Sequence, residues 1–283
     1  MKSIYRIRDL QCLYHQNKHV LKIDSLDIPA GKLVFIIGRS GIGKSTLLEI
    51  LGLMNDPFER NLNALLQFSP ETEFSTNLLS LWNTSDLICS EFRKKHYSFM
   101  FQQTNLMPNF TCGENMMISL LINGKSAASA KKIVLEVMDR LSLERSLFDK
   151  KITEISGGQR QRLSFVRAVT SDFSVLFGDE PTGNLDMISA NEIMSILSEL
   201  VHDQQKSCII VSHDLQLADA FADVVIPITA EHENEVNMCG RIQSENILYR
   251  SNDLWTNSAD ERLNNDGSSL LDCLKKNNVL VAA

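Results

Sequence analysis

The stretch "GRSGIGKST", residues 38–46, constrains the fold of this chain more than any other. It directly follows the apolar run 33–37 and precedes a segment, 44–53, whose apolar residues recur at helical spacing. A glycine-rich loop between a strand and a helix lets backbone N–H groups curl around phosphate oxygens along a path that side chains would obstruct. The sequence therefore predicts a phosphate-binding loop, or P-loop, after a buried strand.

Two side chains at the end of this loop have the chemistry to bind a nucleotide with its metal ion. Lys44 can reach the β- and γ-phosphates, and the Ser45 hydroxyl is placed to ligate Mg²⁺. A chance glycine-rich turn is the alternative, which the flanking strand and helix disfavour. The residues predicted to surround the phosphates are Gly38, Arg39, Ser40, Gly41, Ile42, Gly43, Lys44, Ser45 and Thr46.

The rest of the chain predicts an α/β fold. Continuous apolar runs, typical of parallel strands covered on both faces, alternate with helical patterns at 187–201 and 215–222. The segments 3–10 and 20–28 instead alternate between apolar and polar residues, which favours an antiparallel sheet. We expect a P-loop NTPase core, in which a mainly parallel sheet has flanking helices, with an N-terminal antiparallel β subdomain. The expected parallel strands are 33–37, 174–178, 207–212 and 223–228.

Two further regions are interpreted from their composition and periodicity. Residues of about 105–165 are mainly helical in pattern and predict an inserted helical subdomain. Residues 229–283 are polar, acidic and weakly periodic, which predicts a flexible tail with one short helix at 269–281. The segment 55–93 has no clear assignment. The main domain is therefore expected at 1–228.

Polar residues follow three of the apolar segments, where the carboxyl ends of parallel strands form the ligand-binding edge of a sheet. Asp179 is predicted to hold Mg²⁺, and Glu180 to polarise the water that attacks the γ-phosphate. His213 should reach the same edge, and Gln102 can bond both water and a metal ion. The alternatives are a solvated acidic strand end, a core histidine and a simple turn.

A second helix start also has the features of an anion site. Ser156, Gly157, Gly158 and Gln159 precede a helical pattern whose apolar residues fall at 163, 166 and 169. Because the P-loop already provides a phosphate site, these residues raise the question of whose phosphate they would bind.

Taken together, these motifs resemble the ATP-binding subunit of ABC transporters. The resemblance covers about 4–228 and includes the Walker A loop "GRSGIGKST", a glutamine loop at Gln102 and the signature "ISGGQ". It continues through the Walker B strand "VLFGDE", a D-loop "GNLD" and a switch histidine, His213. Ile155 stands where the family usually has Leu, and Ile42 replaces a customary small residue and is expected to crowd the phosphates.

The resemblance implies a mechanism and partners. Two ATPase domains, identical or paralogous, would bind head to tail with ATP and Mg²⁺ between them. Ser156 and its three neighbours would close on the partner's γ-phosphate, Asp186 would link the two sites, and Tyr14 would stack on adenine. Integral membrane permease subunits would be the other partners. The stretch "DEPTGNLD" looks most like the corresponding stretch of the lipoprotein-release, macrolide-export and cell-division ATPases.

Composition limits the alternatives. The chain has 283 residues and a net charge of −7, so no nucleic-acid partner is expected. Six scattered cysteines favour reduced thiols, and apolar runs are too short for a membrane span, so we expect a cytoplasmic protein peripheral to the cytoplasmic face of the membrane. An ABC-type ATPase acting on ribosomes or DNA, and a regulatory module without turnover, remain the other hypotheses.

Overall fold

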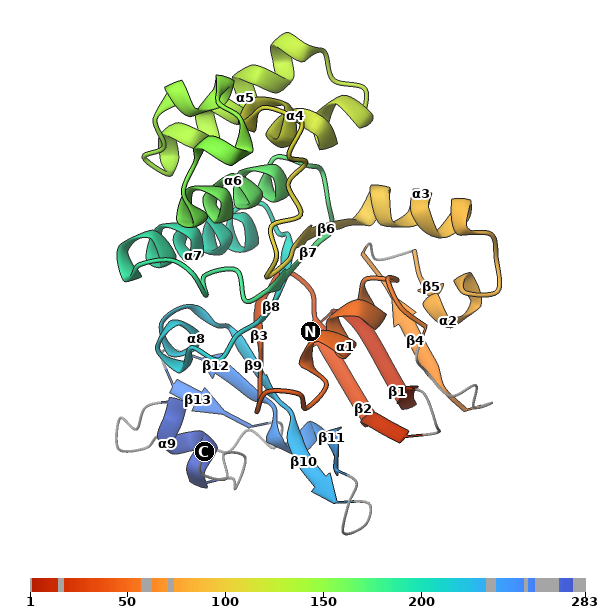
Figure 1. Ribbon diagram of the computed structural model, residues 1–283. Helices are drawn as coiled ribbons and strands as arrows, with labels where there is room; N and C mark the ends of the chain where they lie inside the picture. Colours follow the sequence, from red (N-terminus) through yellow and green to blue (C-terminus); the bar gives the residue numbers. More distant parts are fainter. Residues whose placement is uncertain are drawn as a thin grey trace.

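Two β-sheets form the framework of the computed structural model, which describes residues 2–14, 18–56, 63–70, 74–232, 238–251, 254–257 and 270–276 (Figure 1). Within these residues one sheet has the strand order β13-β12-β9-β3-β8-β7-β6, and the other has the order β10-β11-β2-β1-β4-β5. No helix in these ranges combines the length and the apolar character needed to cross a membrane.

The first sheet contains the expected parallel strands. The pairs β9–β3, β3–β8, β8–β7 and β7–β6 are all parallel. Side chains of β3 alternate between two hydrophobic cores, because Phe35 lies in one and Val34 and Ile36 in the other. A strand buried on both faces explains its continuous apolar run. These strands are β3 (Leu33–Ile37), β6 (Tyr97–Met100), β7 (Val175–Asp179), β8 (Ser207–Val211) and β9 (Val224–Pro227).

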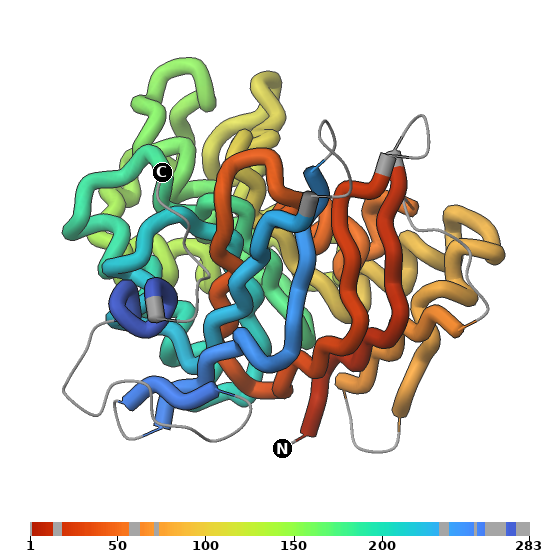
Figure 2. The backbone as a smooth tube through the Cα atoms, turned by 90° about the horizontal axis from the view of Figure 1, so that it is seen from below, coloured from red at the N-terminus to blue at the C-terminus, as the bar shows by residue number. Residues whose placement is uncertain are grey.

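The second sheet carries the N-terminal antiparallel pair. β1 (Ser3–Tyr14) pairs with β2 (Lys18–Pro29), and then with β4 (Leu65–Phe68), always antiparallel. Figure 2 shows this pair beside the parallel strands, and the core between them contains α1 (Lys44–Leu51). The unassigned segment 55–93 adds sheet and helix at this edge, as β5 (Thr76–Asn77), α2 (Leu78–Leu81) and α3 (Asp86–His96).

The helical subdomain is present where the sequence predicts it. Thr111 and Glu114 form a capping box that starts the first of its helices, and the Ser126 side chain caps the second. The buried Asn115 side chain binds the preceding loop through both backbone groups of Met107, at 2.7 and 3.1 Å. The elements are α4 (Cys112–Ile122), α5 (Ala127–Arg140), η1 (Arg145–Asp149), η2 (Ile152–Glu154) and α6 (Gly157–Val169).

Two more helices cover the parallel sheet: α7 (Met187–His202), which begins at an Asp186 cap, and α8 (Leu215–Phe221), which begins at an Asp214 cap. Both lie where the sequence predicts a helix. Residues of both helices belong to the same core as Phe35 of β3.

The expectation of a flexible tail is wrong for the described part of 229–283. β11 pairs parallel with β2, and β12 pairs antiparallel with β9, so this segment extends both sheets. Its buried residues, such as Ile242, Leu248 and Trp255, are separated by polar ones, which explains why the periodicity is weak. The elements are β10 (Thr229–His232), β11 (Met238–Ile242), η3 (Ser244–Asn246), β12 (Leu248–Ser251), β13 (Leu254–Thr256) and α9 (Leu270–Lys276).

A substitution at Gly240 tests how firmly β11 packs against the P-loop. A Cβ added there would overlap the carbonyl oxygen of Ile42 and lie 2.8 Å from Cγ2 of Ile228. We expect Gly240→Ala to lower the free energy of unfolding by about 1–3 kcal/mol, as overpacking does, in a urea titration.

The matched control is Met238→Ala on the same strand, because Met238 is exposed. It should change the free energy of unfolding by less than about 0.5 kcal/mol. Equal urea midpoints for wild type and Gly240→Ala would show that β11 does not pack on the loop.

Candidate nucleotide-binding and catalytic site

The P-loop lies between β3 and α1, with glycines where the backbone needs them. Gly43 has φ 106°, and a Cβ there would lie 3.2 Å from the Val20 carbonyl oxygen. Gly43 is also the N-cap residue of α1, and no side chain caps the helix. The first N–H groups of α1 are therefore available to an anion, with the helix dipole favouring it.

Lys44 crosses the loop. Its Nζ donates to the carbonyl oxygens of Gly38 and Arg39, both at 2.8 Å. Burial lowers the pKa of Lys44, and the nearby carboxylates of Glu180 and Asp179 partly oppose this. The ammonium group is thus held at the loop by two carbonyl groups, in a position where phosphate oxygens can replace them.

Ser45 and Asp179 bring two oxygen ligands together from separate elements. Ser45 Oγ donates to Oδ2 of Asp179 at 3.0 Å. Burial raises the pKa of Asp179, and so does the adjacent Glu180, while the Ser45 hydrogen bond and Lys44 lower it. A divalent cation would favour the carboxylate form. The donor set fits Mg²⁺, which takes one or two protein oxygens and completes its shell with water and phosphate.

The described residues contain no cluster of three or more His, Cys, Asp and Glu side chains that could hold a metal ion. A site for Zn²⁺, which takes three or four such ligands, is therefore absent from this part of the chain.

Glu180 and His213 form a second contact between predicted site residues. Nδ1 of His213 lies 3.1 Å from Oε1 of Glu180. The two residues follow the adjacent parallel strands β7 and β8, where Asp179 pairs with Val211. Glu180 has φ 47°, a sparsely populated backbone conformation, and its N–H donates to the Val211 carbonyl at 2.9 Å. The side chain is thereby fixed at the end of the sheet.

One cavity of about 390 Å³ is lined by Lys44, Ser45, Asp179 and Glu180, among others. Gln102, predicted from a strand end alone, is brought to it. The side chain of Ile42 instead lies in the hydrophobic core, so the expected crowding of the phosphates is wrong. The cavity is lined by Val20, Ser40, Gly41, Gly43, Lys44, Ser45, Thr46, Gln102, Asp179, Glu180 and Val211.

The signature residues are not among those lining this cavity. Ser156 caps α6: its Oγ accepts from Gln159 N at 3.2 Å, and Gln159 Oε1 accepts from Ser156 N at 2.9 Å. Ser156 and Gly157 are exposed. A Cβ on Gly157 would meet only Arg160 Nη2, at 3.9 Å, so nothing within the described chain requires glycine there. Close approach by another molecule would require it.

Gln161 is a site residue that the sequence reasoning missed. It is 2% exposed, and its Nε2 donates to the carbonyl of Pro181 at 2.9 Å and to that of Glu180 at 3.4 Å. It therefore ties the signature helix to the residues around Glu180. A glutamine on the same side of the helix as Phe165, four residues on, is the signal that could have revealed it.

Arg167 is a second missed residue. It donates to the carbonyls of Asn105 at 2.9 Å and Thr104 at 2.8 Å, which joins α6 to the segment after Gln102. Burial lowers the pKa of Arg167.

His213 and Asp186 are also not among the residues that line the cavity, although His213 contacts Glu180, which does line it. Asp186 is exposed and caps α7, where its carboxylate accepts from Ser189 N and Oγ, both at 3.0 Å. These bonds lower the pKa of Asp186. The side chain of Tyr14 lies outside the described residues, so its predicted adenine contact stays a prediction.

A P-loop between a parallel strand and a helix, facing an acidic pair on a neighbouring strand, defines a P-loop NTPase. A family model described as "ABC transporter" matches residues 21–183. The chain is 30% identical over 241 residues to the lipoprotein-releasing system ATP-binding protein LolD of Ehrlichia canis (strain Jake), covering 84% of this chain and 97% of that protein. The chain therefore belongs to the ABC transporter family.

Two other comparisons agree with this. The chain is 33% identical over 235 residues to the macrolide export ATP-binding/permease protein MacB of Photorhabdus laumondii, which covers 82% of this chain but 34% of that longer protein. The dimeric structure of MJ0796, a bacterial ABC transporter cassette, matches with a TM-score of 0.68 and 29% identity, over 78% of this chain and 93% of that one.

A further structure of MJ0796, in a post-hydrolysis state bound to ADP and Pi, has 28% identity and the same TM-score. The expected ATPase activity, the P-loop fold and the family resemblance are confirmed. A transporter ATPase is favoured over an ABC-type ATPase that acts on ribosomes or DNA.

Gln161→Leu tests the link between α6 and Glu180. The substitution conserves much of the volume and leaves two carbonyl groups without their donor, so the free energy of unfolding should fall by about 1–3 kcal/mol. We expect the ATPase rate constant to fall as well, because the Glu180 backbone loses a restraint. Gln216→Ala, at an exposed position, is the control. Unchanged stability and rate for Gln161→Leu would contradict the assigned link.

Proposed function

We propose that this chain is the ATP-hydrolysing subunit of a membrane transporter, and that it acts as a head-to-tail pair. In this arrangement ATP lies between the P-loop of one protomer and the Ser156 helix start of the other. The exposed, uncrowded Gly157 at the start of α6, outside the cavity of its own chain, is the observation that carries the proposal.

Within one site, each residue has a distinct role. The backbone of the P-loop and Lys44 bind the triphosphate. Ser45 and Asp179, 3.0 Å apart, would hold Mg²⁺, with Gln102 beside them in the cavity. Bound Mg²⁺ would neutralise charge on the phosphate oxygens. Glu180 accepts a hydrogen bond from the attacking water and draws its proton toward the carboxylate.

His213 completes the site. Its 3.1 Å contact with Oε1 of Glu180 holds this carboxylate in one orientation. The other ring nitrogen would face the γ-phosphate. Because His213 is exposed and follows a strand end, small movements of its loop would change this contact.

The second helix start makes ATP part of the dimer interface. The N–H groups at the start of α6 and the positive end of its dipole favour a triphosphate oxygen. ATP therefore stabilises the closed pair to the extent that it binds the closed pair more tightly than the separate protomers. Hydrolysis and phosphate release remove the anion that both helix starts share, and the pair opens.

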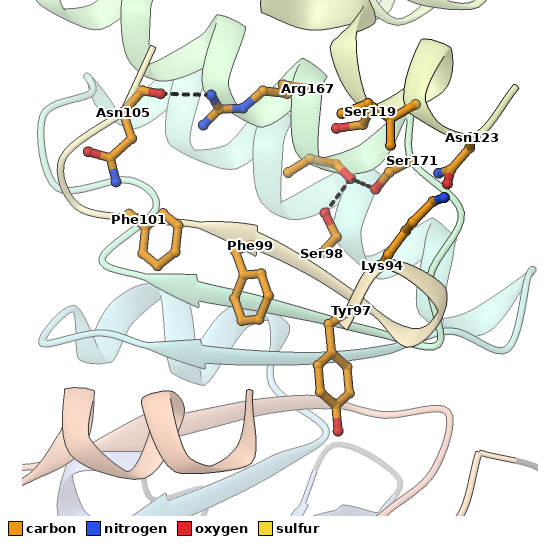
Figure 3. Close-up of a pocket in the computed structure, with 12 residues that line it drawn as sticks. Lys94, Tyr97, Ser98, Phe99, Phe101, Asn105, Ser119, Asn123, Arg167 and Ser171 are labelled. Carbon is orange, nitrogen blue, oxygen red and sulfur yellow. Dashed lines mark hydrogen bonds between the residues drawn. The ribbon is translucent and has the colours of Figure 1, made fainter. Parts of the chain in front are cut away.

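A groove beside this site would receive the membrane partner. It has a volume of about 430 Å³ and lies between β6 and the helical subdomain (Figure 3). The ring centres of Phe99 and Phe101 stack 5.7 Å apart along one wall, and Ile122 at the end of α4 and the following Asn123 lie on the other side. Phe101 directly precedes Gln102, so a helix bound in the groove would be linked to the nucleotide cavity through one peptide bond.

The partner is proposed to be a separate permease subunit at the cytoplasmic face of the membrane. The likeness to LolD spans 97% of that ATP-binding protein, whereas the chain spans about a third of MacB, an ATP-binding/permease protein. Both names describe a release or export system, which supports a membrane partner for this chain. A lipoprotein or an exported small molecule is the substrate class that these two relatives suggest.

Glu180→Gln tests the catalytic assignment. It removes the base but retains the size and a hydrogen bond to His213, so hydrolysis should fall at least about 100-fold while ATP stays bound. Trapped ATP should stabilise a dimer, measured by light scattering with and without ATP. Glu245→Gln, at an exposed carboxylate, serves as control. Undiminished hydrolysis by Glu180→Gln would exclude Glu180 as the base.

Mixing two inactive variants tests the shared site. Lys44→Ala lacks the phosphate-binding lysine, and Ser156→Arg blocks the signature helix start, so each homodimer has two defective sites. A mixed dimer has one intact site, made of the P-loop of one protomer and Ser156 of the other. Equal amounts should recover about a quarter of the wild-type rate, because half of the dimers are mixed. A mixture as inactive as its components would place both motifs in one protomer's site.

A further inference from the structure

The helix after the switch histidine is attached to the C-terminal segment. α8 has only seven residues, and a helix this short depends on tertiary packing rather than on its own propensity. In Figure 1 it lies beside β12, β13 and α9, and the buried side chains of Leu217, Trp255 and Leu270 belong to one core. Elements at the far end of the chain therefore set the position of α8.

Asp219 is the main polar point of this attachment. Its Oδ1 accepts from the indole Nε1 of Trp255 at 2.9 Å and from the backbone N–H of Leu270 at 3.2 Å. Trp255 is 2% exposed. Arg250 adds a third contact, since its Nη1 donates to the Ala220 carbonyl at 3.1 Å and its guanidinium lies 4.7 Å from the centre of the Trp255 ring.

The opposite end of α8 carries the catalytic contact. Asp214 caps the helix, and its Oδ1 accepts from Gln216 N at 2.9 Å and Leu217 N at 3.0 Å. His213 directly precedes this cap and faces Glu180 at 3.1 Å. A shift of α8 would move Asp214 and therefore His213. The P-loop residues that bind ATP lie on other elements and would stay in place.

We propose that Asp219 is a positioning residue for ATP hydrolysis. By holding Trp255 and Leu270 it fixes α8, and through α8 it sets the distance between His213 and Glu180. The inference rests on the proposed role of His213. It gives β12, β13 and α9 a function in turnover in addition to their part in the fold.

Trp255→Phe is the central test, because it removes the indole N–H and keeps an aromatic ring in the core. We expect the kcat of the full chain for ATP to fall about three- to tenfold, the range that loss of one buried hydrogen bond supplies. The KM for ATP should stay within about twofold, since the binding groups are not on α8.

Two Asp219 variants separate positioning from general stability. Asp219→Ala should reproduce the fall in kcat, and Asp219→Asn, which keeps an acceptor oxygen, should restore most of it. Trp82→Phe is the matched control: the indole nitrogen of Trp82 is buried without a hydrogen-bond partner in the described part of the chain, so its kcat should equal that of wild type. Thermal unfolding confirms that each variant is folded at the assay temperature.

Equal kcat for wild type, Trp255→Phe and Asp219→Ala, at whatever melting temperature, would overturn the positioning role while leaving the proposed function intact. So would a parallel rise in KM that accounts for all the lost activity. A wild-type chain without ATPase activity would instead overturn the proposed function, and the inference with it.

Discussion

The parallel pairing of β3, β8 and β7 is the interaction on which the site depends. Because all three strands run in one direction, their carboxyl ends place the P-loop, His213 and the Asp179–Glu180 pair at one edge of the sheet. The register aligns Asp179 with Val211, whose carbonyl then accepts the N–H of Glu180. Backbone pairing thus fixes these groups at one edge of the sheet.

The predictions from the sequence were most accurate for elements that have one strong local pattern. Continuous apolar runs indicated β3, β7, β8 and β9, and the P-loop, Gln102 and Glu180 lie in one cavity as their strand ends imply. Those predictions needed only the rule that parallel strands end together. The resemblance to ABC transporters added the family, which the comparisons confirm.

The features that the sequence did not predict depend on contacts between segments distant in sequence. Strands β10 to β13 are short, and they join the two sheets because β11 pairs with β2 and β12 pairs with β9, both far earlier in the sequence. The helical spacing of Gln161 and Phe165 indicates that Gln161 is buried, but it does not indicate which carbonyl groups of another loop Gln161 binds. The direction of the Ile42 side chain, into the core, also follows from its neighbours and not from its type.

The contact between Gly240 and Ile42 alters what counts as the minimal ATPase. Every recognisable motif lies before Ile228. The strand that packs against the outside of the P-loop, β11, comes after Ile228. A fragment ending after the last motif would keep every motif while lacking the strand that packs behind the P-loop. Changes at the far end of this chain can therefore tune how tightly the loop closes on its ligand without touching any motif.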